Sequence, residues 1–275
     1  MKKIIKIRDK ELILGEKTLI MGILNITPDS FSDGGKYNNL DAALEQVERL
    51  IADGADIIDV GGESTRPGHT QISSKEEIER VVPVIKKIRE KFDILISIDT
   101  YKYDVAKEAL LAGADIVNDI WGFQYDNGEM ADLIKEFDVP AIVMHNQNDE
   151  VYSTDIMEDL KEFFKKTYKI IDEKNIDRNK IILDPGLGFG KNVEQNIEIL
   201  SRLDELCKMG PVLLGASKKR FIGSLLNNLP FDERVEGTVA TSVIGVEKGV
   251  DIVRVHNVLE NKRACLVADG IYRRK

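Results

Sequence analysis

The chain has 275 residues, with 39 lysines and arginines against 48 aspartates and glutamates and a formal net charge of −9. At roughly 100–200 residues per domain, this length allows one large domain or two small ones. The acidic charge argues against binding of nucleic acid or an anionic membrane surface through the overall electrostatic field. No apolar run approaches the roughly 18 residues that a membrane-spanning helix needs, so none is predicted.

The cysteines and the N-terminus indicate a cytoplasmic protein. Cys207 and Cys265 lie neither in a Cys-x-x-Cys pair nor beside histidines at metal-ligand spacing, so we expect buried reduced thiols and no zinc site. The first residues, MKKIIKIRDKELIL, carry charges that interrupt any apolar core of a signal peptide.

The predicted elements begin with a hairpin in residues 1–18, where KIIKI and ELIL turn at Asp9–Lys10 and are placed to plug the floor of a barrel. Eight short runs rich in Ile, Val and Leu follow. They are almost continuously apolar, which is typical of strands buried on both faces. These runs cover residues 19–26, 55–62, 94–99, 115–120, 140–145, 181–186, 211–217 and 251–256.

Segments with a helical period lie between these strands. In LDAALEQVERLIADG, for example, Ala43, Val47 and Leu50 share one face. Eight strands alternating with eight helices predict a (β/α)8 TIM barrel, an α/β fold that forms a single domain over residues 1–275. A doubly wound open sheet is the alternative, but the first strand runs into NITPDSFSDGG instead of a Gly-rich dinucleotide fingerprint.

Two connections, residues 27–39 and 63–74, are too long to be simple joints. Both are rich in Gly, Pro, Ser and Asp, and both follow the carboxyl ends of strands, where barrel enzymes build their active sites. We therefore expect active-site loops, with plain surface loops as the alternative.

Polar side chains interrupt the strands near their carboxyl ends, where an unpaired buried polar group is costly. We expect them to converge on one rim and to bind a ligand. They are Asn25, Asp99, Asn118, Asp184, Lys218, Arg254 and His256. Asp59 and Asp119 lie near the same rim, and for them a structural role and a functional role both remain open.

The residue types indicate the ligand. Carboxylates and an amide suit a flat, nitrogen-rich heterocycle with amino and imino hydrogens. Arg66, Lys218, Arg254 and His256 supply positive charge for a phosphate or diphosphate. A ligand with a polar ring at one end and a diphosphate at the other would use both groups.

These motifs together resemble the dihydropteroate synthase family of pterin-binding enzymes. The run MGILNITPDSFSDGG (21–35) and GGESTRPG (61–68) carry the most specific part of the resemblance. The remaining motifs follow in the expected order over the whole chain: SIDT (97–100), VNDI (117–120), MH (144–145), DPGLGFGK (184–191), GASKKRF (215–221) and RVHN (254–257).

The resemblance implies an enzyme that joins 4-aminobenzoate to 6-hydroxymethyl-7,8-dihydropterin diphosphate, with magnesium assisting. The products would be 7,8-dihydropteroate and diphosphate. It also implies a homodimer and a target of sulfonamides, which mimic 4-aminobenzoate. The partners would be these small molecules, with neither nucleic acid nor membrane.

The resemblance assigns roles to residues that match the family motifs. The catalytic set would be Asp99, Lys218, Arg254 and His256. The pterin site would be formed by Asp99, Asn118, Met144, Asp184 and Lys218. The diphosphate site would be formed by Asn25, Arg66, Arg254 and His256, with Asn25 also binding magnesium. The 4-aminobenzoate site would be formed by Phe31, Thr65, Pro67, Phe189 and Ser217.

Four departures from the family pattern stand out. MHNQND (144–149) lacks a Gly-x-Pro, WGF (121–123) replaces smaller residues, and Asn257 replaces a frequent Asp. Lys219 follows Lys218 where many members have an arginine beside the lysine, so which of the two reaches the pterin stays open.

Two other functions remain as alternatives. A methyltetrahydrofolate-dependent corrinoid methyltransferase would share a pterin-binding barrel but has no use for the cationic cluster of Arg66, Lys218, Arg254 and His256. A non-catalytic pterin binder predicts decay of the two long loops, and both are complete here.

Overall fold

The computed structural model describes residues 2–26, 36–63, 71–126 and 128–273. In this part of the chain the strands are β1 (Lys3–Ile7), β2 (Lys10–Leu14), β3 (Leu19–Asn25), β4 (Ile57–Gly61), β5 (Leu95–Asp99), β6 (Ile116–Asp119), β7 (Ala141–Met144), β8 (Ile181–Asp184), β9 (Leu213–Leu214) and β10 (Ile252–Val255). The helices are α1 (Lys36–Ala52), α2 (Ser74–Lys91), α3 (Tyr103–Ala112), α4 (Glu129–Phe137), α5 (Ile156–Glu173), α6 (Val193–Ser201), α7 (Leu203–Cys207), α8 (Arg220–Leu225), α9 (Val235–Lys248) and α10 (Val258–Tyr272). Two 3-10 turns, η2 (Arg178–Lys180) and η3 (Phe231–Glu233), complete the set.

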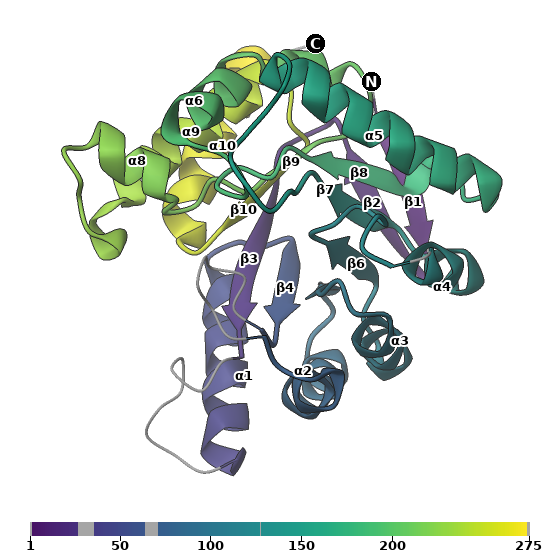
Figure 1. Cartoon of the computed structure of the whole chain (residues 1–275). Coiled ribbons are helices and arrows are strands. Elements are labelled where there is room, and N and C mark those ends of the chain that lie inside the picture. The colour runs from purple at the N-terminus through teal and green to yellow at the C-terminus, as the bar shows by residue number, and fades with distance from the viewer. Residues whose placement is uncertain (1, 27–35, 64–70, 127, 274–275) are drawn as a thin grey trace.

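Strands β3 to β10 form one parallel sheet in the order β8-β7-β6-β5-β4-β3-β10-β9. Val212, directly before β9, bridges to Leu183 of β8 and so joins the two ends of the sheet. The helices lie around the outside of the strands (Figure 1). The predicted (β/α)8 barrel is confirmed, because an open doubly wound sheet would leave β8 and β9 as unpaired edges.

The N-terminal hairpin closes the floor of the barrel, as predicted. β1 and β2 pair antiparallel with Ile5 opposite Leu12, and the turn lies at Arg8–Asp9, one residue before the predicted Asp9–Lys10. Ile5, Ile7, Leu12 and Leu14 are at most 2% exposed, and each buried side chain of this size contributes about 1.5–3 kcal/mol. They pack in one cluster with the lower inward-facing residues Leu19, Met21, Ile57, Ile116, Ile142, Ile182, Leu213 and Ile252.

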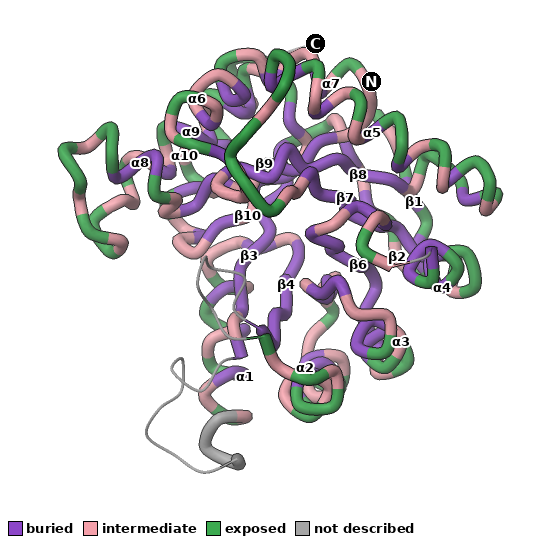
Figure 2. The backbone as a smooth tube through the Cα atoms, in the orientation of Figure 1, coloured by how far each residue is buried: buried purple, intermediate pink, exposed green. Residues whose placement is uncertain are grey.

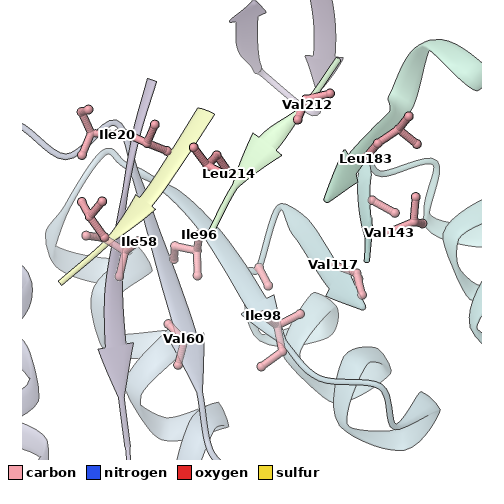
Figure 3. Packing of buried hydrophobic residues seen from close by; sticks show 14 of the residues in the cluster. Ile20, Ile58, Val60, Ile96, Ile98, Val117, Val143, Leu183, Val212 and Leu214 are labelled. Carbon is pink, nitrogen blue, oxygen red and sulfur yellow. The ribbon is translucent and has the colours of Figure 1, made fainter. Parts of the chain in front are cut away.

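The alternate residues of the same strands face outwards and pack beneath the helices. Figure 2 shows the buried strands at the centre and the exposed faces of the helices outside them. Figure 3 labels ten members of this outer layer, Ile20, Ile58, Val60, Ile96, Ile98, Val117, Val143, Leu183, Val212 and Leu214. Because both faces are covered, the strands read as continuous apolar runs.

Several predicted boundaries shift in the structure. α1 begins at Lys36, so the last four residues of the predicted loop 27–39 are helical, while 27–35 lie outside the described residues. The first turn of a helix needs no inward apolar residue, which is why the apolar period did not mark it. In loop 63–74, residues 64–70 are also outside the description, and α2 begins at Ser74, where Ser73 Oγ accepts the Glu76 N–H.

The strand predicted at 211–217 is reduced to the two residues of β9, and helical pairs, α6 with α7 and α8 with α9, follow β8 and β9. None of the helices within the described ranges combines the length and apolar character needed to cross a membrane.

Candidate active site

The inner face of the barrel changes from apolar to polar within two residues along several strands. Ile57 belongs to the floor, whereas Asp59, on the same side of β4, is fully buried and lies beside Ser97 of β5. The same step leads from Ile116 to Asn118, from Ile182 to Asp184 and from Ile252 to Arg254. Strand pairing thus brings these side chains to the carboxyl end of the barrel.

Arg254 of β10 forms ion pairs with carboxylates from two other strands. Its Nε donates to Asp59 Oδ2 at 2.5 Å, and its Nη2 donates to Asp99 Oδ2 at 2.6 Å. Asn118 Nδ2 donates to the same Asp59 oxygen at 3.2 Å. Burial opposes the charge of Arg254, but Asp59 and Asp99 outweigh it and raise its pKa further. The site therefore contains a permanent cation held by two carboxylates.

Two of the predicted pterin residues are carboxylates with raised pKa values. Burial raises the pKa of Asp99 to about 7, although the Arg254 cation opposes the shift. Burial likewise raises the pKa of Asp184 to about 6, against the hydrogen bond that Asp184 accepts from the Gly186 N–H at 2.7 Å. Hydrogen-bond donors of a bound ligand would stabilise both ionised carboxylates.

Met144 lies opposite Asp184 across the β7–β8 pair. It is buried in a small cluster with Tyr101 and Ile120, against which Trp121 and Phe189 pack. This cluster gives the rim an apolar wall beside the carboxylates, where a flat ring can lie.

The two lysines after β9 point to different places. Lys218 Nζ lies 5.1 Å from the centre of the Phe231 ring and 4.0 Å from Asp232, on the side of η3. Lys219 Nζ lies 4.1 Å from the centre of the Phe189 ring, and its charge lowers the pKa of both Asp99 and Asp184. Lys219, rather than Lys218, therefore faces the two carboxylates.

His256 and Ser217 are joined at the ends of β10 and the β9 segment. Ser217 Oγ lies 2.9 Å from the ring nitrogen His256 Nδ1. The same oxygen accepts a hydrogen bond from the backbone N–H of His256 at 3.1 Å. The Phe231 ring also lies edge-on to the His256 ring, at 5.5 Å between centres. The imidazole is thereby held in place two residues along from Arg254.

Asn25 ends β3 next to the acidic group. A methyl group at Gly61 would lie 3.6 Å from Asn25 Oδ1 and 3.8 Å from Asp99 Oδ2, so these two side chains flank the same glycine. The other predicted rim residues, Phe31, Thr65, Arg66 and Pro67, lie outside the described residues.

Three buried atoms on the inner face have no hydrogen-bond partner within the described part of the chain. They are Asp59 Oδ1, Ser97 Oγ and Asp99 Oδ1. Buried polar atoms are paired in nearly all proteins, so unpaired ones that line a rim indicate a ligand that supplies donors. These unpaired acceptors suit a heterocycle with N–H groups, and the cations Arg254 and Lys219 beside them suit an anionic group on the same ligand.

The sequence identified two residues of this site but left their roles open. Asp59 was left between a structural and a functional role, yet its two-residue spacing from Ile57 was enough to place it on the inner face. The family resemblance assigned the lysine of the site to Lys218 and left the role of Lys219 open, and no sequence signal indicated that Lys218 adopts a left-handed backbone with φ of 55° and lies beside Phe231. His145 is 1% exposed, lies 3.5 Å from Asp159, and has its pKa lowered to about 2 by burial, so it is neutral.

The described residues contain no group of three or more His, Cys, Asp and Glu side chains that could hold a metal ion. Among the oxygen donors near the rim, Asn25 offers a single amide. Mg²⁺ commonly keeps several waters and binds through one or two protein ligands together with substrate phosphates. The donor set thus fits a magnesium ion that a diphosphate brings with it.

The chain matches the family model described as pterin binding enzyme over residues 21–256. It is 54% identical over 271 residues to the dihydropteroate synthase of Clostridium beijerinckii, covering 98% of this chain and 100% of the relative.

Solved structures of dihydropteroate synthases are also similar to this chain. A dihydropteroate synthase from Clostridium difficile, determined in the presence of pteroic acid, is 53% identical and superposes with a TM-score of 0.92, over 95% of this chain and 99% of that one. The Xanthomonas albilineans dihydropteroate synthase with 4-aminobenzoic acid is 34% identical with a TM-score of 0.94, over 100% of both chains. The Yersinia pestis enzyme in a sulfonamide drug complex is 39% identical with a TM-score of 0.91, over 98% and 100% of the two chains.

Proposed function

The chain belongs to the dihydropteroate synthase family of pterin-binding enzymes, and we propose that it catalyses the reaction for which the family is named. It would join 4-aminobenzoate to 6-hydroxymethyl-7,8-dihydropterin diphosphate and release 7,8-dihydropteroate and diphosphate. The convergence of Asp59, Asp99 and Asn118 with Arg254 at one rim carries this proposal. No feature favours the corrinoid methyltransferase or a non-catalytic binder.

The pterin would bind over the inner face of the rim. Its amino and imino hydrogens would be accepted by Asp99 and Asp184, whose pKa values are raised by burial and would be lowered by such donors. Asn118 would add an amide, and Met144 an apolar contact. We assign the lysine of this site to Lys219, since Lys218 lies on the side of Phe231 and Asp232.

The diphosphate would bind to the cationic side of the rim, where Arg254 and His256 lie two residues apart on β10. Arg66 would add a second guanidinium, although it lies outside the described residues. Arg254 would keep its Nε bond to Asp59 and exchange its Nη2 bond to Asp99 for the anion. This exchange would also free Asp99 to accept a hydrogen bond from the pterin.

Asn25 would hold a magnesium ion that arrives on the diphosphate, since its amide oxygen can serve as one of the few protein ligands that such an ion needs. When bound, the ion would offset the negative charge that develops on the leaving diphosphate.

The 4-aminobenzoate would bind against Phe189 and Ser217, both at the rim. Phe31, Thr65 and Pro67 would complete this site from outside the described residues. A sulfonamide would compete for the same position, since its aniline ring matches that of 4-aminobenzoate.

In this mechanism the side chains of the rim would contribute by stabilising the charges that develop on the two substrates. As the bond from the exocyclic carbon to the diphosphate breaks, Arg254 and His256 would stabilise the negative charge that passes to the leaving group. Positive charge left on the dihydropterin would be stabilised by the ionised Asp99. The aromatic amine is itself a nucleophile and then loses its proton, so no covalent intermediate with a side chain is required. Direct displacement and ionisation before attack both use the same residues.

We propose a homodimer in the cytoplasm. The outer faces of α9 and α10, which pack together, expose large apolar side chains that a second copy would cover. They are Ile244, Leu266, Val267 and Ile271. Cys207 and Cys265 are both free thiols, as in proteins of a reducing compartment.

The test is to incubate the purified chain with dihydropterin diphosphate, radiolabelled 4-aminobenzoate and Mg²⁺ and to follow labelled dihydropteroate. We expect product with the wild type and its loss in Asp99→Asn, which keeps the size of the side chain and removes its charge. Tight binding of the pterin diphosphate without any product would overturn the proposal in favour of a non-catalytic binder.

A further inference from the structure

Lys191 is a buried lysine that the proposed mechanism does not use. It ends the DPGLGFGK motif between β8 and α6 and is only 3% exposed. Its Nζ donates to three backbone carbonyls, those of Phe189 at 2.9 Å, Gly186 at 3.0 Å and His145 at 3.4 Å. Three acceptors match the three N–H groups of an ammonium, so the site has the geometry that the cationic form requires.

Within the described residues, the contacts of the ammonium are these three carbonyls and no carboxylate. Burial lowers the pKa of Lys191 to about 7, although the more distant Asp184 opposes this shift. Such a group is costly in the interior of a protein unless its hydrogen bonds offset the loss of water. An apolar side chain could fill this volume without that cost, so we expect a role for the amino group itself.

The three carbonyls belong to two different rim loops that approach each other closely. His145 begins the β7–α5 loop, whereas Gly186 and Phe189 belong to the β8–α6 loop. A methyl group at Gly186 would lie 2.0 Å from the His145 oxygen, and one at Gly190 would lie 2.5 Å from the Gln147 oxygen. Both glycines also adopt a left-handed backbone, with φ of 66° and 53°. The Lys191 ammonium donates to carbonyls of both loops at this close approach.

The β8–α6 loop carries Phe189, which lies under Lys219. Phe189 is in a loop, where its N–H donates to the Gly186 carbonyl and its carbonyl accepts from Lys191 Nζ. Asp184, by contrast, is the last residue of β8 and is held by strand pairing with β7. A loss of the ammonium should therefore displace Phe189 more than Asp184.

We propose that Lys191 is a positioning residue whose ammonium binds the β7–α5 and β8–α6 loops together and so sets the position of Phe189 in the 4-aminobenzoate site. This inference rests on the proposed function, because it assigns Phe189 to that substrate. It makes Lys191 a determinant of 4-aminobenzoate binding without contact to either substrate.

The test compares Lys191→Met with Lys135→Met in steady-state assays that vary each substrate separately. Lys135 also donates to a carbonyl, that of Asn175 at 2.6 Å, but it is exposed. We expect Lys191→Met to raise the KM for 4-aminobenzoate about tenfold, as for the loss of a charged hydrogen bond, and to leave the KM for the pterin diphosphate within about twofold. Lys135→Met should match the wild type in both.

A second variant, Lys191→Ala, separates charge from volume. Added n-propylammonium, which replaces the missing atoms, should lower the KM for 4-aminobenzoate towards that of the wild type, whereas propan-1-ol should not. Equal recovery with both, an unchanged KM in Lys191→Met, or equal rises in both KM values would overturn the inference. So would failure of both variants to fold, since Lys191 would then serve only the stability of the fold. A wild type without activity would instead refute the proposed function.

Discussion

The two ends of the barrel are built from the same strands and differ in almost every physical respect. At the floor, Ile57, Ile182 and Ile252 face a hairpin that excludes water. Two residues further along the same strands, Asp59, Asp184 and Arg254 face the rim. The floor contributes stability through buried apolar area, and the rim keeps buried polar atoms whose pairing is incomplete. On each of these strands, the residue that stabilises the floor and the residue that faces the proposed active site are therefore only two positions apart.

The largest effect is expected when the cation at the rim is removed. Arg254→Met would take away a group that binds both Asp59 and Asp99 and, in the proposed mechanism, the leaving diphosphate. We expect kcat/KM to fall about a thousandfold, the size seen when a preorganised charge partner is lost. The assay for labelled dihydropteroate measures this.

Arg178→Met is the matched control for the loss of an arginine. Arg178 pairs with Asp172 on the exposed surface at the other end of the molecule, with 58% of its side chain exposed. It should leave kcat/KM unchanged, since surface ion pairs contribute little. Comparable activities of the two variants would contradict the role assigned to Arg254.

The floor should show the opposite pattern, with stability lost and activity kept. Ile5→Ala, at a position 2% exposed, should lower the free energy of unfolding by about 3 kcal/mol, within the range for deletion of a buried aliphatic side chain. Ile4→Ala, its neighbour with 47% exposure, should change it by less than about 0.5 kcal/mol. Urea unfolding gives both values, and kcat at low temperature should be that of the wild type. A loss of kcat in the folded Ile5→Ala variant would show that floor and rim are coupled.

The sequence predicted the floor and rim unequally well. Continuous apolar runs and their alternation with helical segments predicted the barrel, and the charged turn near Asp9 predicted the hairpin. Asp99, Asn118, Asp184 and Arg254 were predicted at the rim because polar residues at strand ends are conspicuous in such runs.

What failed depends on backbone conformation or on pairing across strands. Lys218 Nζ lies near Phe231 and Lys219 Nζ near Phe189, and the left-handed φ of 55° at Lys218 is a conformation that the local sequence does not reveal. The partners of Asp59 come from β6 and β10, and no single stretch of sequence contains them. The start of α1 at Lys36 was missed because its first turn has no apolar pattern.

The smallest expected effect is on stability and concerns Asp119, a carboxylate near the rim that binds the backbone of the following loop. Asp119 of β6 accepts the N–H groups of Trp121 and Phe123 at 2.8 and 2.7 Å. Burial raises its pKa from 3.8 to about 6, against these two hydrogen bonds. Since the folded pKa is raised, the contribution of Asp119 to stability is fully present below pH 4 and is lost as the pH rises through 6.

Asp119→Asn removes this titration while it keeps one acceptor for the loop. Between pH 4.5 and 7.5 the stability of the wild type relative to the variant should therefore fall by about 2 kcal/mol, the amount that follows from the two pKa values. Urea unfolding of both proteins at the two pH values measures this double difference, in which the other titrating groups cancel. A difference that stays constant with pH would mean that Asp119 is ionised throughout, with its two backbone donors outweighing its burial.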